Sequence, residues 1–156
     1  MQDQKYKPDY DALIPELRLW NAGKGVDIDG WLAGVGSYEH AVAYLRLFWP
    51  AFTVHEDCVL FADFNLESFR GFMEQTIGDK RRVEVVMNHH HILDLFPNVP
   101  QEPSKDLILH LGRALKDIWS CKLKHDFPTR VITVSFPEDE TEDLRDYEIT
   151  FFQDQH

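Results

Sequence analysis

Apolar residues recur every three or four positions along most of the chain, which is the spacing of helices with one buried face. The clearest pattern runs from Ser104 to about Lys124. Its apolar residues fall within a band of about 140° when drawn on a helix. They are Leu107, Ile108, Leu111, Ala114, Leu115, Ile118 and Trp119. Serine is a favoured N-cap residue, so the sequence predicts a long amphipathic helix capped by Ser104.

The same spacing predicts helices in four other segments. They cover residues 9–22, 38–49, 66–77 and 80–96. Pro15 lies inside the first pattern, so that helix should begin near the proline or bend there. Ser37 and Asn65 can cap the second and third helices. Between the first two, the stretch DIDGWLAGVGS predicts a short helical turn and a glycine-rich connection.

Alternation of apolar and polar residues replaces the helical spacing in two places. Residues 52–55 and 58–62 flank the polar pair Glu56–Asp57 and predict a hairpin. Residues 130–136 and 146–152 flank the acidic stretch PEDETEDLR and predict a second antiparallel hairpin.

The order of these elements predicts an α+β fold. Helices precede and interrupt the hairpins, and strands do not alternate regularly with helices. We therefore expect a single domain over residues 1–156, with about five to six helices packed on a small antiparallel sheet. That sheet is made from the two hairpins, near 52–62 and 130–152. The chain has 156 residues with eleven Phe, four Trp and five Tyr, enough for a large core rich in aromatic rings.

Charge excludes some classes of partner. The formal net charge is −11, and residues 137–156 hold eight acidic residues against Arg145 alone. This negative field repels phosphate backbones and anionic lipid, so we expect neither nucleic-acid binding nor membrane binding. A basic protein partner is compatible with the charge, although a solvated loop would carry the same residues.

Few features address the cellular location. No apolar run approaches the roughly 20 residues that cross a bilayer, and the start MQDQKYKPDYDAL lacks the apolar stretch of a signal peptide. Two cysteines, Cys58 and Cys121, are too few for a disulfide framework. We therefore expect a cytoplasmic protein with reduced thiols. Cys121 borders the apolar stripe of the long helix and is expected to be buried.

Three consecutive histidines stand in MNHHHILDLF, residues 87–96. On a helix, His89 would face the apolar side, His90 its edge and His91 the polar side. On a strand, His89 and His91 would share one face and His90 the other. Neither arrangement brings all three to one metal ion. We interpret the segment as helical, with His89 in the core and His90 beside Asp94, one turn later.

Catalytic motifs are missing. The chain lacks the HExxH, G-x-S-x-G, P-loop and G-x-G-x-x-G patterns, and DIDG cannot be aligned with a calcium loop. We therefore predict no cofactor and no metal ligands, and we favour a protein that is not an enzyme.

Two functional hypotheses follow. The leading one is a protein-binding module, acidic and antidote- or regulator-like, that engages a basic protein through the last hairpin. Its candidate binding residues are Glu138, Asp139, Glu140, Glu142, Asp143 and Tyr147. The alternative is a metal-binding protein or an enzyme with a histidine-lined cleft. Its candidate residues are His89, His90, Asp94, His55 and His110. Convergence of three imidazoles or carboxylates would favour the alternative.

Overall fold

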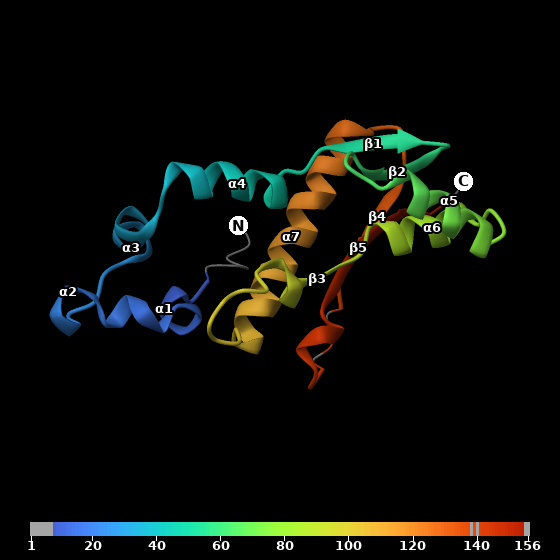
Figure 1. Ribbon diagram of the computed structural model, residues 1–156. Helices are drawn as coiled ribbons and strands as arrows, with labels where there is room; N and C mark the ends of the chain where they lie inside the picture. Colours follow the sequence, from blue (N-terminus) through green and yellow to red (C-terminus); the bar gives the residue numbers. More distant parts are fainter. Residues whose placement is uncertain (1–7, 138, 140, 155–156) are drawn as a thin grey trace, which may run out of the picture. The chain divides into compact units, whose positions relative to one another are not determined.

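The computed structural model describes residues 8–137, 139 and 141–154 (Figure 1). The chain divides into two compact units, residues 1–44 and 45–156. The architecture is α+β, with helices and small antiparallel sheets, which confirms the predicted fold class. The prediction that a single domain spans all 156 residues stays a prediction.

Short helical segments make up the described part of the first unit. They are α1 (Tyr10–Leu13), η1 (Pro15–Arg18), α2 (Trp20–Gly23), α3 (Ile28–Val35) and the beginning of α4 (Tyr38–Phe48). The predicted helix over residues 9–22 is therefore broken into pieces. Ile14 has φ −128° and ψ 77°, because a residue that precedes proline avoids the helical conformation. Asn21 and Ala22 both have a φ of 55°, which interrupts the helix again.

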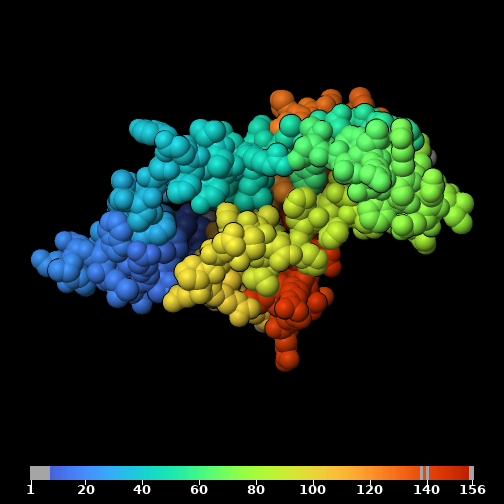
Figure 2. All heavy atoms as spheres, viewed as in Figure 1, coloured from blue at the N-terminus to red at the C-terminus, as the bar shows by residue number. Residues whose placement is uncertain are grey.

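The second unit combines two hairpins with helices. Its helical segments are α5 (Leu66–Gln75), α6 (Lys80–Met87), η2 (Ile92–Leu95), α7 (Lys105–Asp126) and η3 (Leu144–Asp146). Its strands are β1 (Phe52–His55), β2 (Cys58–Phe61), β3 (His90–His91), β4 (Ile132–Ser135) and β5 (Glu148–Gln153). Figure 2 shows the atoms of α5 and α6, in green, packed together at one end of this unit.

Both predicted hairpins are confirmed, but they lie in two sheets and not in the one sheet that was predicted. Strand β1 pairs with β2 across the turn Glu56–Asp57, and β4 pairs with β5 across the acidic loop. The three-stranded sheet has the order β3–β5–β4, and all of its pairs are antiparallel. The sequence did not predict β3, which lies where a helix was expected.

The predicted helix caps are also present. Ser37, Asn65 and Ser104 each accept a hydrogen bond from the backbone N–H three residues later, at 3.1, 2.8 and 3.2 Å. Each bond satisfies one of the free N–H groups at the start of a helix. These side chains therefore fix where α4, α5 and α7 begin.

Helix α7, the longest of the second unit, supplies one wall of its core. Its fully buried Trp119 donates a hydrogen bond from Nε1 to the carbonyl of Leu47 at 2.8 Å. Gly112 is needed for close packing, because a Cβ there would lie 2.1 Å from Cζ of Phe136. The predicted apolar stripe is thus the face that α7 buries.

Strands β2 and β5 belong to different sheets, and α6 joins them through two buried side chains. The Glu84 carboxylate accepts hydrogen bonds from the backbone N–H groups of Val59 at 2.6 Å and Gln153 at 2.7 Å. It also accepts one from Nε2 of Gln153 at 2.8 Å. The Asn88 amide donates to the carbonyls of Val59 at 2.9 Å and Phe151 at 3.1 Å. Both side chains are 0% exposed. Strands β2 and β5 do not pair with each other through their backbones, and these side chains supply hydrogen bonds between them instead.

A second polar group fixes the turn of the first hairpin. Arg130 donates from Nη1 to the Asp57 carboxylate at 2.9 Å and to the Gln153 side chain at 2.5 Å. Gln153 in turn donates from Nε2 to the Asp57 carbonyl at 2.8 Å. Arg130 and Lys80 lower the pKa of Asp57. The turn is therefore tied both to the start of β4 and to the end of β5.

We predict that Glu84→Gln lowers the free energy of unfolding by about 2–4 kcal/mol, because an amide NH₂ would face buried donors that need an acceptor. Glu74→Gln, on an exposed position of α5, is the matched control and should change it by less than about 0.5 kcal/mol. Urea unfolding of the two variants measures both values. Equal stability of the two variants would contradict the proposed role of Glu84.

Candidate metal centre

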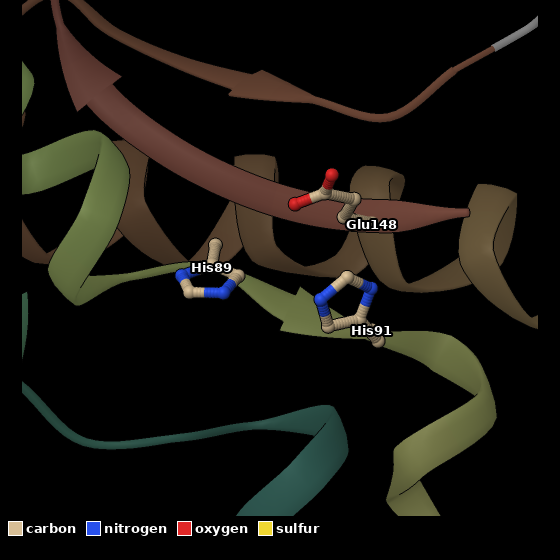
Figure 3. Close-up of side chains that lie close together, drawn as sticks. All are labelled: His89, His91 and Glu148. Carbon is tan, nitrogen blue, oxygen red and sulfur yellow. The ribbon is translucent and has the colours of Figure 1, made fainter. Parts of the chain in front are cut away.

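Two histidines and a glutamate converge on one surface of the second unit (Figure 3). One possible ligand atom from each of His89, His91 and Glu148 lies within 4.8 Å of the others. The two imidazole rings have centroids 5.5 Å apart and planes inclined by 85°. Among the described residues, this is the one group of three His, Cys, Asp or Glu side chains with such spacing.

The end of α6 creates this arrangement. The helix ends at Met87, and Asn88 is its C-cap residue. The chain then enters β3, where His91 lies opposite Glu148 in the antiparallel register. Successive side chains on an extended segment point to opposite faces, so His89 and His91 share the face that Glu148 occupies.

His90 points away from the cluster. Its ring packs edge-on against Phe61, with centroids 4.9 Å apart, and lies 6.0 Å from the ring of Trp119. Partial burial of the ring lowers the pKa of His90, although part of the residue remains exposed at the surface. This histidine therefore contributes to packing against the core and not to the cluster.

Backbone hydrogen bonds orient both histidine rings of the cluster. Nδ1 of His89 lies 2.7 Å from the carbonyl of Val86, and Nδ1 of His91 lies 2.8 Å from the carbonyl of Arg145. A carbonyl oxygen can only accept, so each Nδ1 must carry the proton. In a neutral ring, Nε2 then holds a free lone pair. Histidines that bind metals commonly have their second nitrogen held in this way.

The three side chains differ in their access to solvent. His89 and Glu148 are exposed, and His91 is half-buried. An ion could therefore reach the cluster from solution without opening the core. Two imidazole nitrogens and a carboxylate form a ligand set that suits zinc and other first-row transition metals.

The structure corrects the helical interpretation of the histidine run. As predicted, the three consecutive histidines do not converge on one point. Two of them, however, converge with a carboxylate from another strand. The placement of His89 in the core was wrong, because α6 ends before it and leaves it exposed. His90 and Asp94 are not one helical turn apart, because Asp94 lies in the separate segment η2 and is exposed.

The other histidine candidates lie elsewhere. His55 is on β1, where its ring packs against Phe64 and Phe69. His110 is on α7 and is half-buried. Neither belongs to the cluster. The residues missed by sequence reasoning are His91 and Glu148, whose signal was the alternating H-x-H pattern together with an acidic residue at the start of a predicted strand.

The acidic loop is described only in part. Glu138 and Glu140 lie outside the described residues, whereas Asp139, Glu142 and Asp143 are exposed. Tyr147 is 0% exposed, and its hydroxyl accepts a hydrogen bond from the backbone N–H of Thr141 at 3.0 Å. Tyr147 is thus a core residue and offers no aromatic surface to a partner. Engagement of a basic protein by the acidic residues stays a prediction.

The two cysteines have opposite environments. Cys58 is 0% exposed on β2, and its burial, followed by the charge of Glu84, raises the pKa of its thiol to about 12. Cys121 is exposed on α7, which corrects its predicted burial. It lies at the edge of the apolar stripe, on the side of the helix that faces solvent.

Comparison with known proteins finds no matching family model, no similar curated protein and no similar solved structure. The geometry of this chain is therefore the basis for inferring its function. In the part of the chain that the structure describes, no helix has both the length and the apolar character needed to cross a membrane.

We predict that a thiol reagent modifies one cysteine in the folded protein and two after unfolding in urea. Cys121 is exposed and should react, whereas burial and a raised pKa keep the Cys58 thiol from forming the reactive thiolate. Mass spectrometry of the labelled peptides measures the result. Rapid labelling of Cys58 in the folded state would contradict the described packing of β2.

Proposed function

We propose that this protein binds a divalent transition-metal ion through His89, His91 and Glu148. The observation that supports the proposal most strongly is that both Nδ1 atoms donate to backbone carbonyls. Each ring is held in place, and the remaining nitrogen of each is ready to bind.

The ligand types indicate the class of metal. Imidazole favours Zn²⁺, Cu²⁺, Ni²⁺ and Fe²⁺, whereas Mg²⁺ and Ca²⁺ prefer sites made of oxygen atoms. Ligand atoms around a tetrahedral zinc ion lie about 3.3 Å apart, given zinc–nitrogen bonds of about 2.0 Å. The ligand atoms of this cluster lie within 4.8 Å of one another, so binding would bring them closer by about 1.5 Å at most.

Three protein ligands leave at least one coordination position for water or for another molecule. Structural zinc sites usually have four protein ligands, whereas sites that exchange a ligand usually have three. The cluster therefore supports binding of an ion that remains accessible to solution. This departs from the leading sequence hypothesis of an acidic protein-binding module and develops its alternative.

Isothermal titration calorimetry with Zn²⁺ tests the proposal. We expect one ion per chain, with no competition from an excess of Mg²⁺. The variants His89→Gln, His91→Gln and Glu148→Gln should each weaken binding more than about tenfold, because each removes a ligand. Acidification from about pH 7.5 to about pH 5 should release the ion, because protons compete for the imidazole nitrogens.

Two matched variants control for general effects of removing a histidine or a carboxylate. His125→Gln alters an exposed histidine on α7, and Glu142→Gln alters an exposed acid outside the cluster. Both should bind Zn²⁺ like the unaltered protein. Absence of binding, or equal weakening in the control and ligand variants, would refute the proposed site.

A further inference from the structure

The cluster adjoins the segment that carries the acidic residues. Residues 136–147 connect β4 to β5, and they end at Tyr147, next to the proposed ligand Glu148. Several hydrogen bonds stay within this segment. Thr141 Oγ1 donates to the Asp143 carbonyl at 2.8 Å, and Asp143 Oδ1 accepts from the Arg145 N–H at 2.9 Å. These bonds shape the segment but do not attach it to its neighbours.

Strand β3 and the residue after it provide an attachment. His91 donates from Nδ1 to the carbonyl of Arg145 at 2.8 Å, and the N–H of Ile92 donates to the carbonyl of Tyr147 at 2.9 Å. The adjoining ladder is short, because β3 pairs with β5 only through His90 with Ile149 and His91 with Glu148. A ladder of this length has few backbone hydrogen bonds to break, although the neighbouring side chains of Tyr147 and Ile149 are buried in the core.

We propose that the metal ion clamps the end of the acidic segment, from Arg145 to Glu148, onto β3. This inference rests on the proposed metal binding. An ion on Nε2 of His91 withdraws electron density from the ring and makes the Nδ1 proton a stronger donor to the Arg145 carbonyl. The same ion binds Glu148 directly. Both ends of the four-residue stretch 145–148 are then held to one strand.

Metal binding therefore regulates how firmly the acidic segment is held. Glu142, Asp143 and Asp146 are exposed on this segment, so the ion would control the mobility of a charged surface that lies outside its own ligand set. Local opening that must break the β3–β5 ladder would also have to release a ligand, which lowers the population of the open state.

Hydrogen exchange followed by mass spectrometry tests the clamp. Exchange of the amides between Arg145 and Ile149 should slow by at least about threefold when Zn²⁺ replaces EDTA, because open states lose population. Amides in the buried centre of α7 serve as the internal reference and should not change. His89→Gln keeps the bond from His91 to Arg145 but lacks one ligand, and it should lose the effect of zinc. His125→Gln should keep that effect.

Calorimetry on the same samples separates the two proposals. If Zn²⁺ binds through the three ligands and exchange at 145–149 does not change, the clamp is refuted while metal binding stands. If Zn²⁺ does not bind, both proposals fail. Nuclear magnetic resonance of the His91 ring gives a second test. The clamp requires a slowly exchanging proton on Nδ1 in the zinc-bound protein, and zinc on Nδ1 would overturn it.

Discussion

Two polar side chains, Glu84 and Asn88, hold the second unit together. Glu84 lies on α6 and Asn88 is its C-cap residue, one turn later, so both point to the same side of the helix. A buried carboxylate is costly unless donors surround it, and the Glu84 carboxylate accepts hydrogen bonds from Val59 and Gln153. These bonds join the two sheets, whose apolar side chains also share one core. They also fix the position of α6 against the strands, on which the geometry of the next residues depends.

The position of Asn88 determines where the side chains of the three histidines that follow it point. Its amide binds the carbonyls of Val59 and Phe151, and it is also the residue at which α6 ends. The chain therefore continues beside β5 as a strand, and His91 comes to lie opposite Glu148. The metal cluster and the clamp that we infer from it are consequences of this helix end. The packing of His90 against Phe61 on the other face follows from the same alternation.

The sequence predicted those elements whose signals are local. Helix α7 and both hairpins have a regular apolar pattern with caps or turns at their ends, and all were confirmed. The end of α6 could not be predicted in this way, because apolar spacing continues beyond Asn88 into η2. The bonds that stop the helix reach residues 29 and 63 positions away. Glu148 was likewise recognisable as an acidic residue on a strand, but its partner strand was unknown.

Anomalous diffraction at the zinc absorption edge, from crystals grown with Zn²⁺, tests the central claim most directly. We predict a strong anomalous peak for one zinc ion, which Nε2 of His89, Nε2 of His91 and the Glu148 carboxylate coordinate. Nδ1 of His91 should still donate to the carbonyl of Arg145. The proposed site would be contradicted if no peak lay between β3 and β5. It would also be contradicted if the zinc ion were coordinated by His90 or by Nδ1 of His91.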